Sequence, residues 1–319
     1  RPLPWTQVGS RSVADPGVTQ VGIYDLHSFN QAFFDRLRTR VQAAQQRGIY
    51  VSVMLFSGGH LGYFTRGWFS HPFNSANNVN GIDGDKNADG KGLETHTLAD
   101  PAIVAIQEAY LKKIVDTVND LPNVIYEISN EDYATSVAWQ NHMADLIRQM
   151  ESPRARHPVW ISAWQDMPHN EHVFAMRADI VGPNNSSDDY DNNPPASTGE
   201  KVVFADSDHM GTETPQWPWK IFLRGAYAVF LDERETPSVR AAIKKAMGQT
   251  IAYSKRIDLG AMSPAKDTVV CSTGYCLMKP GTEYLMYLPA GGPATINLSG
   301  ITGNFSVEYL HQGTGQAAS

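Results

Sequence analysis

A strand-like run that ends in an amide and a carboxyl group carries the strongest chemical signal in this sequence. Residues 124–131 read Val-Ile-Tyr-Glu-Ile-Ser-Asn-Glu, so a mostly apolar run closes on Asn130 and Glu131. Cleavage of a glycosidic bond needs a carboxylic acid that protonates the leaving oxygen and a second carboxylate opposite it. The amide of Asn130 can hold a sugar hydroxyl. A structural interpretation places Glu131 in the first turn of the next helix, where an acid stabilises the helix dipole; the two roles are compatible.

A second acidic cluster closes a later apolar run. Residues 202–209 read Val-Val-Phe-Ala-Asp-Ser-Asp-His, which places Asp206, Asp208 and His209 at the end of the run. Carboxyl groups that end a buried strand are costly unless they have partners or a task. One task is that of the second carboxylate in glycoside cleavage. The alternative is a divalent metal ion, which carboxylate and imidazole ligands suit, although three such close neighbours on a regular strand cannot all point at one ion.

A third motif resembles the opening of a calcium-binding loop. From residue 85 the sequence reads D-x-N-x-D-G, which offers oxygen ligands on Asp85, Asn87 and Asp89 and a glycine for the turn. The twelfth position is His96, where an EF-hand has glutamate, so another carboxylate would have to complete the site. The alternative interpretation is a solvated polar loop without an ion.

Further aromatic and polar residues near the ends of apolar runs are candidates for sugar contacts. An exposed tryptophan ring can stack on the face of a sugar, although core packing is the commoner role of any single tryptophan. Amide and imidazole groups can bond sugar hydroxyls. The expected substrate-binding residues are Asn130, His209, Trp164, Asn184, Trp68, His71, Trp217 and Trp219.

The elements that must position these side chains alternate between apolar runs and amphipathic segments. Continuous apolar runs separated by helices are typical of parallel strands buried on both faces. The expected strands are 49–56, 123–129, 158–164, 178–183, 202–205 and 227–231. The expected helices are 29–47, 101–120, 133–150 and 237–255. In the second helix apolar residues recur every three or four positions, and Pro101 suits its first turn.

This alternation predicts an α/β fold, in particular a (β/α)₈ barrel. A dinucleotide-binding sheet would need a G-x-G-x-x-G fingerprint, which the sequence lacks. Polar residues follow the strands instead, at the position where barrel enzymes hold their active sites. Numbering the six strands three to eight places Glu131 after strand four and Asp208 after strand seven. The numbering predicts that two N-terminal βα units are missing and that residues 1–27 form a long loop.

The pattern changes near residue 260. Short alternating runs separated by Pro-Gly and Gly-Gly turns predict a small antiparallel β-sandwich over 261–319, itself truncated. The predicted domains are therefore a catalytic barrel over 1–260 and an accessory sandwich over 261–319. Between Cys271 and Cys276 four residues could turn a hairpin and allow a disulfide; two free buried thiols are the alternative.

Composition excludes several classes of protein. The 319 residues are 42% hydrophobic and 18% charged, which is enough to bury a large core and excludes intrinsic disorder as the main state. Lys and Arg number 26 against 33 Asp and Glu, a net charge of −7. With no basic run, the chain is a poor match for nucleic acid or an anionic membrane. No stretch reaches the length of an apolar membrane span.

The two carboxylate motifs together resemble a family of barrel enzymes. The patterns Y-E-I-S-N-E over 126–131 and D-S-D-H over 206–209 are similar to those of clan A glycoside hydrolases, whose acid/base and nucleophile follow barrel strands four and seven. With W-x-W-K-x-F-x-R-G over 217–225, they resemble the apiosidase-like barrel proteins in particular. Several of these carry a small β-sandwich, once labelled a collagen-binding domain, after the barrel. The resemblance covers most of the chain and is weak for the substrate.

The resemblance implies roles for individual residues. Glu131 would be the general acid/base, and Asn130 would contact the sugar 2-hydroxyl. Asp208 would be the nucleophile, with Asp206 as the alternative, although most of the clan has glutamate at this position. The clan also uses an arginine from strand two, a strand that this chain lacks in our numbering.

The expected function is a retaining glycoside hydrolase that acts on β-linked plant-type poly- or oligosaccharide. It would be either a β-glycanase such as a cellulase or an exo-glycosidase such as an apiosidase. The alternatives are a non-catalytic carbohydrate-binding barrel and a metal-dependent hydrolase that uses Asp206, Asp208 and His209. We expect no required cofactor apart from a structural calcium ion, no nucleic-acid or membrane partner, and a secreted or periplasmic location in a bacterium, in polysaccharide degradation.

Overall fold

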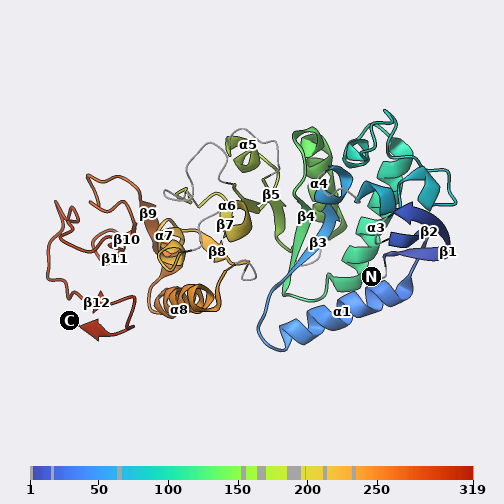
Figure 1. The fold of residues 1–319 in the computed structure, drawn as a ribbon. Coiled ribbons are helices and arrows are strands. Elements are labelled where there is room, and N and C mark those ends of the chain that lie inside the picture. Colours follow the sequence, from blue (N-terminus) through green and yellow to red (C-terminus); the bar gives the residue numbers. More distant parts are fainter. Residues whose placement is uncertain are drawn as a thin grey trace. The chain divides into compact units, whose positions relative to one another are not determined.

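The computed structural model describes residues 3–15, 18–62, 67–151, 156–163, 170–184, 195–197, 199–210, 214–231 and 235–318. The chain forms two compact units (Figure 1). Unit 1 comprises residues 1–167 and 171–180, and unit 2 comprises residues 168–170 and 181–319. The predicted domain boundary at residue 260 is a different division of the chain and stays a prediction.

A β-hairpin occupies the segment that we expected to be a loop. Strand β1 (Trp5–Asp15) pairs antiparallel with β2 (Val18–Phe29), from Trp5 opposite Phe29 to Asp15 opposite Val18. Much of the hairpin is exposed and polar, so its sequence lacks the apolar alternation that would have revealed it. Trp5 anchors the hairpin, because its buried ring packs edge-on against Phe73 at 5.3 Å. The expectation of a loop over residues 1–27 was therefore wrong.

Parallel strands form the centre of unit 1. Strand β3 (Val51–Ser57) pairs with β4 (Val124–Asn130), and β4 pairs with β5 (Val159–Ser162). Every residue of β4 before Asn130 is buried, as expected for a strand covered on both faces. Strand β6 (Ile180–Gly182) begins at the boundary of the unit. The order of the parallel strands, β3-β4-β5-β6-β7-β8, follows the chain.

Unit 1 has three long helices, of which the third packs against β4 and the second packs against the other two (Figure 1). They are α1 (Gln31–Gln45), α3 (Pro101–Val118) and α4 (Val137–Glu151). Helix α3 begins as predicted, because the Asp100 side chain accepts the N–H groups of Ala102 and Ile103 and Pro101 occupies the first turn. The shorter elements of the unit are α2 (Gly59–Gly62), η1 (Trp68–Ser70), η2 (Ser75–Asn77), η3 (Leu93–His96), η4 (Ala134–Ser136) and α5 (Glu171–Phe174).

Unit 2 contains two further parallel strands and a C-terminal antiparallel sheet. Strand β7 (Val202–Asp206) pairs with β8 (Tyr227–Val229). The helices are α6 (Ser207–Met210), α7 (Trp217–Leu223) and α8 (Pro237–Ser254), followed by the turn η5 (Leu259–Ala261). The antiparallel strands are β9 (Ser263–Ala265), β10 (Cys276–Lys279) and β11 (Glu283–Met286) in the order β11-β10-β9, and β12 (Tyr309–Leu310) with β13 (Ala317–Ala318).

The C-terminal strands share their core with helices α7 and α8. Trp219 and Leu223 of α7 pack in one apolar cluster with Ala246 of α8 and with Tyr275 and Leu277 beside and on β10. This shared core explains why the residues after 260 belong to unit 2. The antiparallel pairing is confirmed, whereas a two-sheet sandwich stays a prediction.

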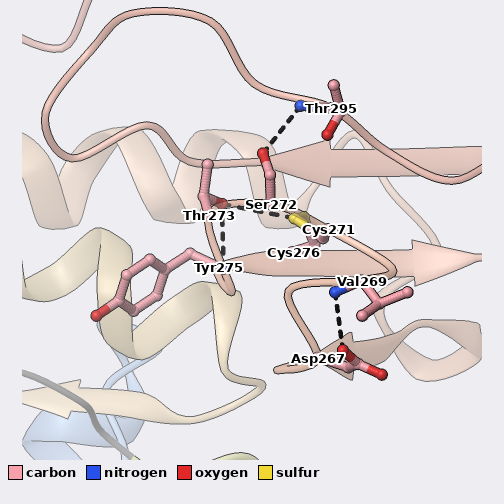
Figure 2. Close-up of a disulfide and its surroundings, with 8 residues drawn as sticks. All are labelled: Asp267, Val269, Cys271, Ser272, Thr273, Tyr275, Cys276 and Thr295. Carbon is pink, nitrogen blue, oxygen red and sulfur yellow. Dashed lines mark hydrogen bonds between the residues drawn. A yellow bond between two sulfur atoms is a disulfide. The ribbon is translucent and has the colours of Figure 1, made fainter.

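A disulfide joins Cys271 to Cys276 and settles the alternative in favour of a bond. Figure 2 shows the loop that it closes, in which the Thr273 hydroxyl accepts the N–H of Tyr275 at 3.2 Å. Thr295 donates its N–H to the hydroxyl of Ser272 at 2.9 Å and so ties a second segment to this loop. Both cysteines are fully buried.

The α/β class and the parallel order of the strands are as predicted. Closure into an eight-stranded barrel stays a prediction. Among the described residues, no helix combines the length and the apolar character that crossing a membrane would require.

Candidate functional site

The carboxyl end of β4 presents Glu131 on an unusual backbone. Asn130 ends the strand half-buried, and Glu131 follows with a φ of +50°. Residues other than glycine seldom adopt this left-handed backbone conformation. It costs about 1–3 kcal/mol, which the surrounding contacts must offset. Such strained residues cluster at functional sites. Glu131 is itself half-buried, so its carboxyl group lies at the boundary between the packed strands and solvent.

Gly58, the first residue after β3, packs directly on this segment. Its N–H donates to the carbonyl of Asn130 at 2.8 Å. A Cβ atom at position 58 would lie 2.4 Å from the Cα of Asp132 and 2.7 Å from the carbonyl oxygen of Glu131. Both of these neighbours are backbone atoms, so only glycine allows β3 and the Glu131–Asp132 segment to approach this closely.

Asp132 ties the strained segment to the loop before α3. Its Oδ2 lies 2.7 Å from Nδ1 of His96, and its Oδ1 accepts the N–H of Tyr133 at 2.9 Å. The side chains of Asp132 and His96 are 2% and 4% exposed, so this bond lies in a low-dielectric interior. The bond therefore fixes the residue that directly follows Glu131.

A frame of aromatic and amide side chains holds His96. The imidazole stacks on Trp139 of α4 with ring centroids 4.1 Å apart and an interplanar angle of 6°. Trp139 Nε1 donates to Gln107 Oε1 at 2.9 Å, and Gln107 Nε2 donates to the carbonyl of Thr95 at 2.8 Å. Helix α4 therefore supports the imidazole through Trp139, and α3 holds the backbone just before His96 through Gln107.

The carboxyl end of β7 carries the second pair of acids. Asp206 ends the strand, and its Oδ1 accepts the N–H of Asp208 at 2.9 Å, so it caps the short helix α6. Between them Ser207 is 1% exposed, and its hydroxyl accepts the N–H of Leu231 beyond β8 at 3.0 Å. Asp206 and Asp208 are both half-buried. The side chain of His209 lies outside the described residues.

The two strand ends belong to different units. Glu131 lies in unit 1, and Asp206 and Asp208 lie in unit 2. The pairing of Glu131 with either aspartate across a cleft therefore stays a prediction.

In the loop after β3, the expected aromatic platform Trp68 is packed against neighbouring residues. The ring of Trp68 is 6% exposed, and a Cβ at Gly92 would lie 2.1 Å from two of its ring atoms. The opposite neighbour is His71, whose ring stacks at 5.3 Å. The ring of Trp68 is therefore largely packed within the loop, and sugar stacking on it stays a prediction.

His71 has a structural role in the same loop. Its Nδ1 accepts the N–H of Phe73 at 3.2 Å, which requires the unprotonated nitrogen. Burial, reinforced by the charges of His96 and His60, lowers its pKa to about 3. The His71 side chain is half-buried and bonded to its own backbone segment, and its role in substrate binding stays a prediction.

The tryptophans of α7 are likewise in the core. Trp217 is 0% exposed and Trp219 is 5% exposed. Trp219 stacks on Tyr287 and packs among the residues shared with the C-terminal strands. Both rings are buried in this structure, and the roles of Trp217 and Trp219 in sugar binding stay predictions.

The remaining predicted contacts are described in part. Asn184 follows β6, where its backbone exchanges two hydrogen bonds of 2.8 and 2.9 Å with the side chain of Asn170. Trp164 lies outside the described residues. The roles of Asn130 and Asn184 in substrate binding stay predictions.

The D-x-N-x-D-G loop forms a tight turn. The carboxylate of Asp85 accepts the N–H groups of Asp89 and Gly90, each at 3.0 Å, and Asn87 Oδ1 accepts the same N–H of Asp89 at 2.9 Å. Asp85 and Asp89 also line an open pocket of about 390 Å³ together with Trp68 and Asn74. Within the described ranges, no three His, Cys, Asp or Glu side chains converge as a metal cluster. Calcium binding by Asp85, Asn87 and Asp89 stays a prediction.

Sequence reasoning missed the residues that support the candidate acids. Asp132 and Ser207 adjoin the candidate acids in the chain, and Gly58 lies two residues beyond a predicted strand, so these three positions could have been considered from the sequence. His96 lies 36 residues from Asp132, and only the fold brings the two together.

Comparisons with known proteins give a likeness of fold. No protein-family model matches the chain, and no curated protein matches it. A solved structure that resembles it is that of a "putative glycoside hydrolase" from Bacteroides vulgatus ATCC 8482, with 16% sequence identity and a TM-score of 0.50. The match covers 79% of this chain and 47% of that chain, so this chain spans about half the length of that protein.

Proposed function

We propose that this chain is a retaining glycoside hydrolase that cleaves β-linked plant-type poly- or oligosaccharide. The observation that carries the proposal is the end of β4, where Asn130 and Glu131 follow a buried parallel strand and the backbone of Glu131 is held at a φ of +50°. Strain at a carboxylate on this edge of a parallel sheet is typical of a residue placed for chemistry. The similar fold of the "putative glycoside hydrolase" supports the same class of enzyme.

In the first step, Glu131 is the general acid and Asp208 is the nucleophile. The Asp208 carboxylate attacks the anomeric carbon and forms a glycosyl ester, while the bond from that carbon to the leaving oxygen breaks. The Glu131 carboxylic acid gives its proton to the leaving oxygen. The amide of Asn130 would hold the sugar 2-hydroxyl beside the reacting carbon.

In the second step, water hydrolyses the glycosyl ester. The Glu131 carboxylate takes a proton from the water while the water oxygen bonds to the anomeric carbon. The bond from that carbon to Asp208 breaks, and the Asp208 carboxylate leaves. Two inversions return the sugar to its original configuration.

The choice of Asp208 over Asp206 follows from the hydrogen bonds of β7. One oxygen of Asp206 already caps α6 through the N–H of Asp208. A carboxylate that holds a backbone N–H is stabilised as an anion, and this makes it a weaker nucleophile.

The proposal also includes the architecture and the compartment. The parallel strands β3 to β8 would belong to a (β/α)₈ barrel, with catalytic residues after strands four and seven. The Cys271–Cys276 disulfide supports secretion or a periplasmic location, because such bonds persist in oxidising compartments.

Hydrolysis of aryl β-glycosides and β-glucans by the full chain and by Glu131→Gln tests the activity. We expect turnover by the unaltered chain with retention at the anomeric carbon, and loss of turnover in the variant. A carboxyl separation of about 5–5.5 Å between Glu131 and Asp208 in a crystal structure would agree with retention, whereas about 6.5–9.5 Å would indicate inversion. Binding of oligosaccharide without any hydrolysis would replace the proposal with a carbohydrate-binding barrel, and loss of hydrolysis in EDTA would replace it with a metal-dependent hydrolase.

A further inference from the structure

We propose that the buried pair Asp132–His96 positions the acid Glu131, a role that rests on the proposed function. The pair lies next to Glu131 and does not touch the reacting atoms itself, so it acts through the backbone. Its two side chains come from the residue after Glu131 and from the loop before α3.

The geometry at residue 132 leaves the segment little freedom. Asp132 Oδ2 is bound to His96 Nδ1 at 2.7 Å inside the protein, and Gly58 packs against the Cα of Asp132 from the other strand. The residues on both sides of Glu131 are therefore fixed. The carbonyl of Asn130 accepts the N–H of Gly58, and the side chain of Asp132 is buried. The left-handed backbone of Glu131 is the conformation compatible with both attachments.

The support behind His96 makes the pair a rigid one. The imidazole lies flat on Trp139, whose indole N–H is bound to Gln107, and Phe56 of β3 packs edge-on against the same imidazole at 5.7 Å. An acid must lie within hydrogen-bond reach of the leaving oxygen, and a displacement of about 1 Å can cost a hundredfold in rate. The pair would thus set the position of the Glu131 carboxyl group through one peptide bond.

Two substitutions at His96 separate the hydrogen bond from the ring stacking. His96→Phe keeps a ring on Trp139 and removes the donor to Asp132. His96→Asn keeps a donor near the position of Nδ1 and removes the ring. The control is His142→Gln, which replaces the imidazole of a half-exposed imidazole–carboxylate bond of similar length, 2.6 Å from His142 Nε2 on α4 to Glu108 on α3.

The readout is kcat/KM on two aryl β-glycosides of the same sugar, one with a phenyl and one with a 2,4-dinitrophenyl leaving group. Only the phenyl group needs a proton from Glu131. For His96→Phe we expect kcat/KM to fall about 10- to 100-fold on the phenyl glycoside and less than about threefold on the dinitrophenyl glycoside. His96→Asn should recover most of the loss, and His142→Gln should change neither value. An equal fall on both substrates, or no fall, would overturn the positioning role.

Crystal structures of the full-length unaltered chain and of His96→Phe separate this inference from the proposed function. We expect φ of Glu131 to leave the left-handed region in His96→Phe and to remain near its original value in His142→Gln. A φ that stays near +50° in His96→Phe would overturn the inference, whatever the activity. If the unaltered chain hydrolyses neither glycoside but φ moves as expected, the proposed hydrolase activity fails and the control of the Glu131 backbone by the pair stands.

Discussion

The ends of β4 and β7 hold their candidate acids with different chemistry. At both ends a half-buried carboxylate adjoins a buried polar residue that ties the strand to a neighbouring segment. At β4 this residue is Asp132, whose carboxyl group bonds the imidazole of His96. At β7 it is Ser207, whose hydroxyl accepts the N–H of Leu231. The backbone is strained only beside the first of these bonds, at Glu131.

This difference predicts how strongly each strand end responds to substitution. Removing one partner of a buried carboxylate–imidazole bond leaves the other without compensation, which is costly in a low dielectric. Removing the serine hydroxyl leaves one backbone N–H, and Leu231 is only half-buried. We therefore expect the end of β4 to respond more strongly than the end of β7 to equivalent substitutions.

The largest effect should come from the acid itself. Glu131→Gln removes the proton donor, so kcat/KM on a phenyl β-glycoside should fall about 10²- to 10⁴-fold. The melting temperature should change little, because Glu131 is half-buried. The matched control is Glu108→Gln on α3, which should leave the kinetics unaltered. Equal activity of the Glu131 variant and the unaltered chain would remove Glu131 from the mechanism.

The next largest effect should come from the close approach at Gly58. In Gly58→Ala the new methyl group meets backbone atoms of Asp132 and Glu131, which cannot move aside as a flexible side chain could. We expect a loss of about 1–3 kcal/mol in the free energy of unfolding, measured in urea, together with slower hydrolysis. Gly248→Ala in α8 is the control, because its Cβ meets nothing within 4 Å, and it should be neutral or stabilising by about 0.5–1 kcal/mol.

Ser207→Ala should have a smaller effect. The variant deprives the N–H of Leu231 of its partner, and an unsatisfied buried group costs about 1–3 kcal/mol. We expect the low end of this range, because water can reach Leu231. A loss in urea unfolding larger than that of Gly58→Ala would reverse the comparison between the two strand ends.

A pH titration extends the comparison from the two strand ends to the two units. In unit 1, His157 Nδ1 lies 2.5 Å from a carboxylate oxygen of Glu151 and Nε2 lies 3.0 Å from the carbonyl oxygen of Leu121, so a protonated imidazole has an acceptor at each nitrogen. The hydrogen bond to Glu151 raises the pKa of His157 above its ordinary value of 6.5. The contribution of the His157–Glu151 hydrogen bond to the free energy of unfolding is therefore complete below about pH 6.5. This contribution is lost as the pH rises through the raised pKa of His157.

Hydrogen exchange between pH 6 and pH 9 would measure this effect. After correction for the intrinsic rate, we expect protection around His157 to fall with rising pH, whereas the core between α7 and β10 should change less. His157→Gln is the control, and its protection should be lower at pH 6 and flat above it. The same pH dependence in the variant would show that another group is responsible.

Sequence patterns predicted best the elements that are buried on both faces. The apolar run that became β4 was placed within one residue of its observed bounds, because a strand covered on both faces is apolar along most of its length. The β1–β2 hairpin was missed for the opposite reason. It is largely exposed, and its stability comes from backbone pairing and from a few anchors such as Trp5.

The candidate site was predictable only where the chemistry is local. Asn130 and Glu131 follow one strand and could be read directly, whereas the support from His96 depends on a loop 36 residues away. Residue type alone could not distinguish an exposed tryptophan from a buried one. Trp68 is packed between His71 and Gly92, and Trp219 is covered by Tyr287, both through contacts that the fold creates.

Trapping of the glycosyl-enzyme intermediate would identify the nucleophile of the proposed retaining hydrolase. The full chain would be incubated with a 2,4-dinitrophenyl 2-deoxy-2-fluoro-β-glycoside, which slows the second step, and its peptides would then be examined by mass spectrometry. If Asp208 is the nucleophile, one fluorosugar is added to the peptide that contains Asp208, and none is added in Asp208→Asn. A label on Asp206 would exchange the roles of the two aspartates. Turnover of an ordinary aryl β-glycoside with inversion of configuration, and with no trapped sugar, would contradict the retaining mechanism.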